Sequence, residues 1–382
     1  MSNIIFKLFA DKQGGRQTST YIGKYGDIFY DPEIGSLKLS NGTTAGGIAI
    51  TEPTVVSVAD NRWYVDPSRT DIPAGASTGS LNNPFLTITS ALAYIEARIA
   101  DGSLTISMSG DETVVDNPQF IILTSSTTEN VTLTRGYVYI VGDTPNAGHV
   151  PIWINGHVTI TPSSATDGLN VNRFGLFHIA VIPTGDYHGI EINGSNACKV
   201  YLEDTYVYQR NSSKSCVYAN NTGSGSRVEL LGCTMGRDTG STYLIDIQRG
   251  YCKIENLETN GAGQALNQAN DSTGTMLSSS IDANTGAVVT LSGTAQWGMG
   301  NCILNNTSTA ANSYGVSMSG TATMQFGVCT FNIPSAQATN RAINGVAGNV
   351  VLYAAPVIQY GTCAKISTAI TLLPLVTALT AA

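Results

Sequence analysis

Three glutamates recur at a constant interval in the middle of the chain: Glu203, Glu229 and Glu255. Two carboxyl groups about 5 to 9.5 Å apart are the arrangement that cleaves glycosidic bonds, with one of them acting as an acid. A structural repeat of this length would bring the three side chains together and make them the catalytic candidates. The alternative is a row of solvated carboxylates on a strand surface, which requires no function.

A second kind of chemistry, elimination by a polysaccharide lyase, needs a base and a cationic clamp. His178, His188, Arg210 and Lys214 supply these residue types without a regular spacing. Further acidic side chains of the same region are Asp186, Glu191, Asp204, Asp238, Asp246, Glu258, Asp271 and Asp282. Because no Asp or Glu occurs from Ala283 to the last residue, an acid–base site would lie between about 110 and 282.

Tyrosines in this region suit binding rather than catalysis. Six of them lie among Asn and Gln residues: Tyr201, Tyr206, Tyr208, Tyr218, Tyr243 and Tyr251. An exposed Tyr is a common contact for sugars, because its ring is apolar and its hydroxyl is polar. The alternative places these rings between neighbouring coils of a repeat or between subunits.

The composition limits the classes of partner. The 382 residues carry a net charge of −8, and only 12% of them are charged. Nucleic acid as the main partner would need clustered Lys and Arg, and no basic run occurs, so we expect no nucleic-acid binding. The apolar stretches at the two ends of the chain are interrupted or short, so we expect neither a signal peptide nor membrane insertion.

Glycine, serine, threonine and asparagine are abundant, with 40 glycines alone. These residues disfavour helices and suit short strands joined by many turns. The seven cysteines are scattered singly, without the spacing of a zinc site, at 198, 216, 233, 252, 302, 329 and 363. We expect them to be small buried apolar residues, and we expect no metal and no cofactor, although zinc binding or disulfides remain the alternative.

The segment "GDIFYDPEIGSLKLSNGTTAGG", residues 26 to 47, predicts a hairpin followed by a glycine-rich turn. Its pattern is carried by Gly26, Ile28, Tyr30, Asp31, Leu37, Leu39, Ser40, Asn41, Gly42, Thr44, Gly46 and Gly47. It resembles the small N-terminal β-prism unit of bacteriophage tail fibre and tropism-determinant proteins. The resemblance implies that residues 1–60 attach the protein to a virion, with Gly26, Gly42, Gly46 and Gly47 in tight turns and Ile28, Tyr30, Leu37 and Leu39 in a shared core.

A single helix is predicted, in the segment "NPFLTITSALAYIEARIA". Ile88, Ala91, Leu92, Ile95 and Ile99 recur with helical spacing. The segment is similar to the start of right-handed β-helix proteins, including phage tailspikes, in which a short amphipathic helix covers the open end of the solenoid. We therefore expect residues 61–104 to form a linker and a capping helix.

Residues 105–370 contain a repeat of about 27 residues, the length of one coil of a parallel β-helix. Ser292-Gly293-Thr294-Ala295 matches Ser319-Gly320-Thr321-Ala322, and Cys302 matches Cys329. Further rows expected from this interval are Val316–Ile343, Cys329–Pro356, Ile190–Val217–Leu244 and Val200–Val228–Ile254. Residues 258–287 fit the interval poorly, which predicts a loop that leaves the solenoid, and residues 371–382 are expected to cap the C-terminal end.

The sequence thus predicts an all-β chain: a right-handed single-stranded parallel β-helix of seven to nine coils, with a β-prism unit and a short capping helix. The resemblance implies a homotrimeric tail fibre or tailspike, assembled in the bacterial cytoplasm and located on the virion beside other tail, baseplate or capsid proteins. Its solenoid would recognise a polysaccharide of the host surface. The alternatives are a depolymerase of the same shape, either glycoside hydrolase or polysaccharide lyase, and a decoration protein of capsid or tail that binds no glycan.

Overall fold

The computed structural model divides the chain into two units, residues 1–61 and 62–382. In the first unit it describes residues 22, 24, 28–31, 36–45, 48–49 and 61. In the second it describes residues 62–374 except 74–76, 109–114, 144–151, 164–171, 211–212, 241, 262, 334–338, 354–357, 361–363, 367–368 and 370.

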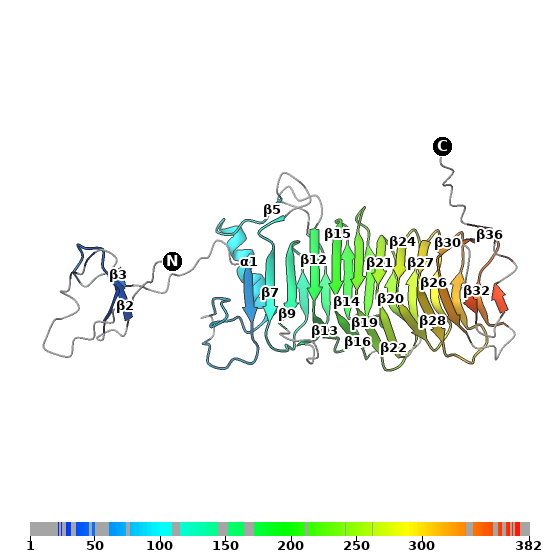
Figure 1. The fold of residues 1–382 in the computed structure, drawn as a ribbon, viewed down its shortest axis with the longest axis horizontal. Helices are drawn as coiled ribbons and strands as arrows, with labels where there is room; N and C mark the ends of the chain where they lie inside the picture. The colour runs from blue at the N-terminus through cyan, green and yellow to red at the C-terminus, as the bar shows by residue number, and fades with distance from the viewer. Residues whose placement is uncertain are drawn as a thin grey trace, which may run out of the picture. The chain divides into compact units, whose positions relative to one another are not determined.

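The second unit is a β-solenoid built from three parallel sheets (Figure 1). Sheet I contains β4 (Arg62–Val65), β7 (Gln119–Leu123), β9 (Val138–Gly142), β12 (Asn172–Phe177), β15 (Cys198–Glu203), β18 (Arg227–Leu231), β21 (Tyr251–Glu255), β24 (Thr273–Leu277), β27 (Gln296–Gly300), β30 (Thr323–Phe326), β33 (Val350–Tyr353) and β36 (Thr371–Pro374). Sheet II contains β10 (Ile152–Asn155), β13 (Ile179–Ile182), β16 (Tyr206–Gln209), β19 (Thr234–Arg237), β22 (Glu258–Gly261), β25 (Ser280–Ala283), β28 (Cys302–Asn306), β31 (Cys329–Asn332) and β34 (Ile358–Tyr360). Sheet III contains β8 (Val131–Leu133), β11 (Val158–Ile160), β14 (Ile190–Gly194), β17 (Val217–Asn221), β20 (Tyr243–Ile247), β23 (Gln264–Gln268), β26 (Ala287–Leu291), β29 (Tyr314–Met318), β32 (Arg341–Asn344) and β35 (Ala364–Ile366).

Each coil visits sheets I, II and III in turn, so strands that pair within a sheet come from successive coils. Nine coils, from β9 to β35, contribute one strand to every sheet. A short antiparallel pair, β5 (Ser107–Met108) and β6 (Val115–Asp116), forms a separate sheet. The predicted parallel β-helix is confirmed, with a number of coils at the upper end of the expected range.

The core is one continuous column of apolar side chains enclosed by the three sheets. Most strands alternate buried and more exposed positions, because successive side chains of a strand point to opposite faces. Cys302 pairs with Cys329, and both are buried, as predicted. All six cysteines in the described part of the chain are buried and free; Cys363 lies outside it.

The register confirms some predicted rows and corrects others. Val316 pairs with Ile343, Ile190 with Val217, and Val200 with Val228. The next partner of Val217 is Ile245 rather than Leu244, Val228 pairs with Cys252 rather than Ile254, and Cys329 pairs with Ile358 rather than Pro356. These errors have one cause, which is that coils differ in length at their turns.

Residues 258–287 stay in the solenoid, so the prediction of a loop was wrong. They form β22 to β25 and the start of β26. Tyr251 pairs with Thr273, and Thr273 pairs with Gln296, so the coils of this region are shorter than the repeat seen in the sequence. Shorter turns keep the strands in register, and a search at one constant interval misses such coils.

The corner between sheets I and II is made by a single residue in the left-handed backbone region. This residue is His178, Asp204, Gly232, Asn256, Ser278 or Asn301 in successive coils, with φ between 46° and 62°. Asn, Asp and Gly tolerate this conformation better than other residues. The corner therefore explains part of the abundance of these residues.

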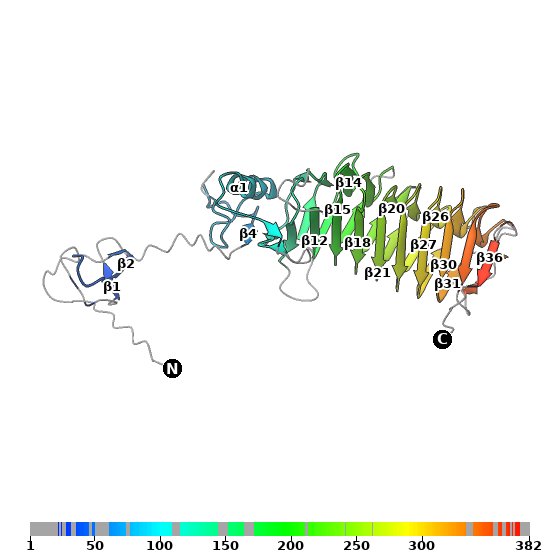
Figure 2. The ribbon, with the colours of Figure 1, turned by 90° about the horizontal axis from the view of Figure 1, so that it is seen from above.

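The predicted helix is confirmed as α1 (Ile88–Ala100), and it packs at the N-terminal end of the solenoid beside β4 (Figure 2). Thr87 caps it by accepting a hydrogen bond from the Ser90 amide at 3.0 Å, and Ile88, Ala91 and Ile95 are buried. Glu129 anchors its first turn by accepting hydrogen bonds from the Ile88 and Thr89 amides at 2.8 and 3.1 Å.

Both ends of sheet I lie in segments that were expected to be outside the solenoid. β4 pairs with β7 although residues 61–104 were predicted to be linker and helix, and β36 pairs with β33 although residues 371–382 were predicted to be a cap. The segments 62–65 and 371–374 are therefore strands of sheet I.

The first unit contains an antiparallel sheet of β1 (Ile28–Asp31), β2 (Ser36–Leu39) and β3 (Ile48–Ala49). Ile28 pairs with Leu39 and Tyr30 with Leu37, so the predicted hairpin is present. Gly42 has φ of 78°, which suits glycine in a tight turn. Gly26, Gly46 and Gly47 lie outside the described residues, and assembly into a prism stays a prediction.

One glycine of the core makes room for a neighbouring ring. A Cβ on Gly274 would overlap the Trp297 ring and the Cys252 carbonyl oxygen, which belong to the strands on either side of β24. We expect Gly274→Ala to lower the free energy of unfolding by about 3 kcal/mol, because an overfilled core strains side chains and backbone.

Gly298→Ala is the matched control, since its Cβ would point outward with Thr275 Cγ2 at 3.5 Å as the nearest atom. Thermal and denaturant melting of both variants would test the prediction. Equal stability of the two variants would contradict it.

Candidate functional site

The three candidate glutamates all lie on sheet I, but the register does not stack them. Glu203 and Glu255 pair with the intervening Leu231, whereas Glu229 pairs with Tyr201 and Lys253. The expected adjacency of the three side chains is therefore wrong. The glutamates are evenly spaced in the sequence, but the coil from β15 to β18 is longer than the coil from β18 to β21.

Two of the three carboxylates are held in ion pairs. Arg227 Nε lies 2.7 Å from Glu229 Oε1, and Lys253 Nζ lies 3.2 Å from Glu255 Oε2. A hydrolytic pair needs one carboxyl group that keeps or takes up a proton. Arg227 and Lys253 are the structural partners of Glu229 and Glu255.

The four lyase candidates are divided between two places. His178 lies at the corner between sheets I and II, 3.3 Å from Asp204 Oδ2. His188 accepts a hydrogen bond from the Ser215 amide at 3.0 Å, and Lys214 lies 3.9 Å from Asp186. Arg210 directly follows β16.

The six tyrosines face outward from all three sheets rather than forming one cluster. Tyr201 and Tyr251 belong to sheet I, Tyr206 and Tyr208 to sheet II, and Tyr218 and Tyr243 to sheet III.

On sheet II, Trp153, which the sequence did not single out, meets the Tyr206 ring edge-on with centroids 5.8 Å apart. Tyr208 stacks beside Tyr206, and its hydroxyl donates to Asp238, which raises the pKa of Tyr208 to about 12.

A hollow that combines aromatic and charged side chains lies at the corner between sheets III and I. It has a volume of about 570 Å³. Its lining comprises Lys199, Asn221, Thr222, Gly223, Ser224, Gly225, Ser226, Arg227, Arg249, Gly250, Tyr251, Asp271 and Thr273, which we call the corner groove. The turn 222–226 is longer than the turn 248–250 of the next coil, and the hollow lies where this length changes.

A row of positive charges runs along sheet I into the corner groove. Arg173 pairs with Lys199, Lys199 with Arg227, and Arg227 with Tyr251, one per successive strand. We call Arg173, Lys199 and Arg227 the basic row. The basic row is not evident in the sequence, because coils of unequal length separate its members.

Tyr251 forms the aromatic part of the groove. The Arg227 guanidinium lies over its ring, 4.7 Å from the centroid, and its hydroxyl is 3.0 Å from Thr275 Oγ1. These contacts fix the orientation of the ring before any ligand binds, which reduces the entropic cost of binding.

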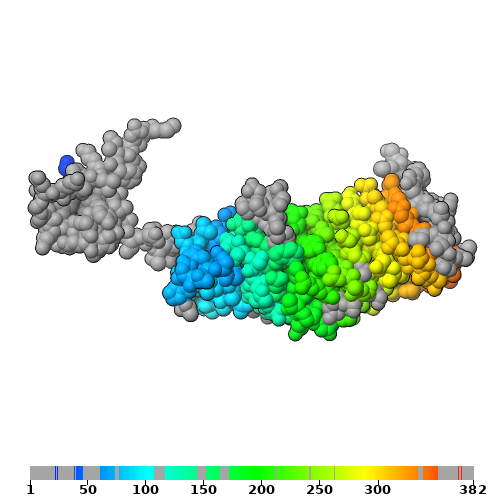
Figure 3. Space-filling model, turned by 90° about the horizontal axis from the view of Figure 1, so that it is seen from below, coloured from blue at the N-terminus to red at the C-terminus, as the bar shows by residue number. Residues whose placement is uncertain are grey.

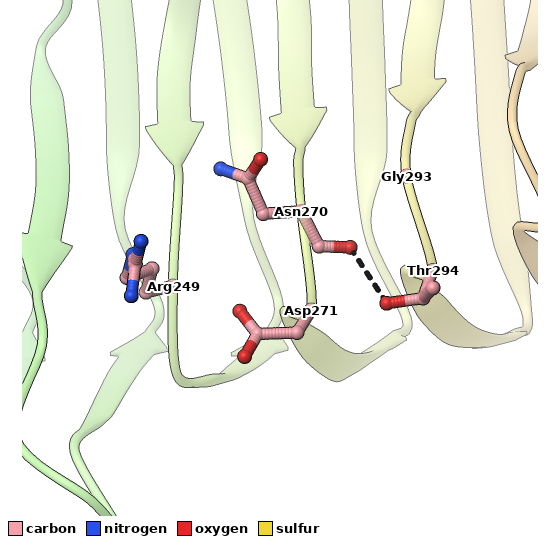
Figure 4. A pocket seen from close by; sticks show the side chains of 5 residues that line it. All are labelled: Arg249, Asn270, Asp271, Gly293 and Thr294. Carbon is pink, nitrogen blue, oxygen red and sulfur yellow. Dashed lines mark hydrogen bonds between the residues drawn. The ribbon is translucent and has the colours of Figure 1, made fainter.

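A smaller hollow of about 330 Å³ adjoins the groove and shares Arg249 and Asp271 with it. In Figure 4 the Asp271 carboxylate extends toward Arg249, while Thr294 donates a hydrogen bond to the Asn270 carbonyl oxygen at 3.1 Å. Asp271 is the one carboxylate among the lining residues of the two hollows. The site therefore offers cations, hydroxyls, amides and an aromatic ring, which suit binding, and it lacks the second carboxyl group of a hydrolytic pair.

No protein-family model, no curated protein and no solved structure matches this chain. Within the described ranges no helix is long and apolar enough to cross a membrane. In the same residues no group of three or more His, Cys, Asp and Glu side chains is placed to hold a metal ion.

The stacked rings of His188, which precedes β14, and Tyr218 of β17 generate a pH dependence. Their ring centroids are 4.4 Å apart, and burial lowers the pKa of His188 against smaller opposing effects of Glu191, Asp246 and Asp186. The unfolded chain therefore takes up a proton first as the pH falls. The contribution of neutral His188 to the free energy of unfolding is fully present above the unfolded pKa of about 6.5. This contribution is lost as the pH falls through the lower pKa of the folded state.

We expect His188→Asn, whose amide oxygen can still accept from the Ser215 amide, to lose less stability than wild type between pH 7.5 and 5. Melting temperatures across this range would test it. An unchanged pH dependence of His188→Asn would contradict the assignment.

Proposed function

We propose that this protein is a homotrimeric virion protein of the tail fibre or tailspike type, which recognises a host surface glycan through its solenoid. The observation that carries the proposal is the corner groove, where Tyr251, hydroxyls, amides and cations converge on a rigid β-framework. Glycans are bound by such combinations of aromatic faces and fixed polar groups. The resemblance of residues 26–47 to virion-attachment units supports the location on a phage particle.

Recognition without cleavage is the form of the proposal that the carboxylates favour. Glu229 and Glu255 are ion-paired on sheet I, and Asp271 has no second carboxylate beside it in the groove. Glu203 and Glu255 are separated by Leu231 in the register, and Glu229 pairs with Tyr201 and Lys253, so no two of the three glutamates are register partners.

We expect the full-length protein to bind surface polysaccharide of a susceptible host, and Tyr251→Ala to weaken this binding about five- to tenfold, since an aromatic contact is worth roughly 1 kcal/mol. Calorimetric titration would measure the affinity, with Tyr243→Ala on sheet III as the matched control. Equal affinity of Tyr251→Ala and wild type would remove the corner groove from the binding site.

Incubation of the protein with the same polysaccharide should release no new reducing or unsaturated ends. Appearance of such ends, and their loss in Glu203→Gln, Glu229→Gln or Glu255→Gln, would show that the protein is a depolymerase. A protein that binds no surface glycan at all would fit the role of a decoration protein.

The trimer and the attachment role of the first unit are tested together. Mass measurement of the purified protein should give an assembly of three copies of the chain.

Deletion of residues 1–60 should leave a folded trimeric solenoid that is no longer incorporated into virions. β-type circular dichroism and melting would verify folding of the truncated chain. A monomer at micromolar concentration would remove the trimer, and virions that still carry the truncated protein would reverse the roles of the two units.

A further inference from the structure

The basic row is unusual in a chain of this composition. Only 19 of 382 residues are Lys or Arg, and the net charge is −8, yet three cations occupy three successive positions of one column. Paired strands lie about 4.8 Å apart. Like charges at directly opposite positions of neighbouring strands destabilise a sheet.

The neighbouring carboxylates neutralise only part of this charge. Glu229 pairs with Arg227, but Arg173 and Lys199 form no ion pair with any residue that the structure describes. Arg249 also lacks an ion pair in that part of the chain, although Asp271 faces it across the smaller hollow. The charges of Lys199 and Arg249 in the corner groove are therefore available to pair with a ligand.

The arrangement matches a linear, negatively charged ligand. In the solenoid the order of the coils along the axis is the order of the sequence (Figure 3), so an elongated ligand on the surface would meet one residue per coil. The strand spacing is about the length of one pyranose ring in an extended glycan. Arg173, Lys199 and Arg227 would then face successive sugars, and the Tyr251 ring would lie in line with them.

We propose that the corner groove and the basic row bind an acidic polysaccharide, whose carboxylate or phosphate groups pair with Lys199, Arg173 and Arg249. The inference rests on the proposed recognition of a glycan and names its chemical class. Guanidinium groups match carboxylate and phosphate geometry in two hydrogen bonds, which gives specificity as well as attraction.

A polysaccharide fits better than a nucleic acid, which is also a polyanion. Nucleic-acid binding surfaces use many phosphate contacts and belong to basic proteins or domains. Here the basic row and Arg249 lie beside Glu229, Glu255 and Asp271 on a chain of net charge −8.

The test uses full-length protein and a panel of purified bacterial surface polysaccharides that are neutral, uronate-bearing or phosphate-bearing. Binding is measured by biolayer interferometry at several NaCl concentrations. We expect binding to acidic members only, with an affinity that falls as salt rises, because exposed charges are screened. The uronate and phosphate arms identify the source of the charge.

Lys199→Gln should weaken binding about tenfold at low salt and flatten the salt dependence, because one charge-assisted hydrogen bond is lost. Lys199→Arg should retain most of the affinity. Lys253→Gln is the matched control, since Lys253 lies on the same face of sheet I but is paired with Glu255. Lys199→Gln should also raise the melting temperature of the free protein slightly, whereas loss of a structural contact would lower it.

Three results would overturn the inference. If neutral glycans bind, and neither salt nor Lys199→Gln changes their affinity, the protein binds glycans but its ligand is uncharged. Equal affinity for a single-stranded oligonucleotide would assign the row to nucleic acid. Absence of binding to every polysaccharide would instead remove the proposed function itself.

Discussion

Every feature of the solenoid depends on the hydrogen bonding of one coil to the next. Each strand of sheets I to III pairs in parallel with the strand one coil away, so the backbone groups of a coil are satisfied by its two neighbours. Side chains must then form rows along the axis, and the inward rows are mostly apolar and mutually compatible in size, with buried polar members such as Arg237 and Gln268. The contact of Gly274 with the Trp297 ring shows how closely such a row is filled, since the ring occupies the space that a Cβ would take.

The same constraint explains which features the sequence predicts. Helical spacing identifies α1, because five apolar residues on one face are unambiguous, and the SGTA match with Cys302–Cys329 identifies coils of constant length. The rows that were predicted wrongly cross coils of other lengths. The interval between paired residues of sheet I shows how coil length varies. From Lys199–Arg227 the interval becomes shorter at Arg227–Tyr251 and shorter still at Tyr251–Thr273, and it is longer again at Gln296–Thr323. A single repeat length cannot describe coils whose turns differ in length. Turn length can vary because only the strands have to stay in register with their neighbours.

The candidate site was predictable in residue type but not in place. Tyr251 was identified from its chemistry, yet its neighbours come from four coils and include no motif that is local in the sequence. The corner groove exists because a longer turn, 222–226, adjoins a shorter one, and the basic row exists because two coils of unequal length align three cations. Each coil of this fold is stabilised mainly by its two neighbours. The repulsion among the three cations therefore lowers stability only at one outward row and does not disturb the apolar core.

The difference in length between the turns 222–226 and 248–250 also bears on how such a surface diversifies. A residue gained or lost at this corner changes the depth and lining of the hollow, while the strands on both sides keep their partners and the interior keeps its volume. The residues that shape the hollow and the residues that hold the apolar core together are therefore largely separate. An insertion or deletion in this turn should therefore cost less stability than one of equal length inside a strand of the solenoid.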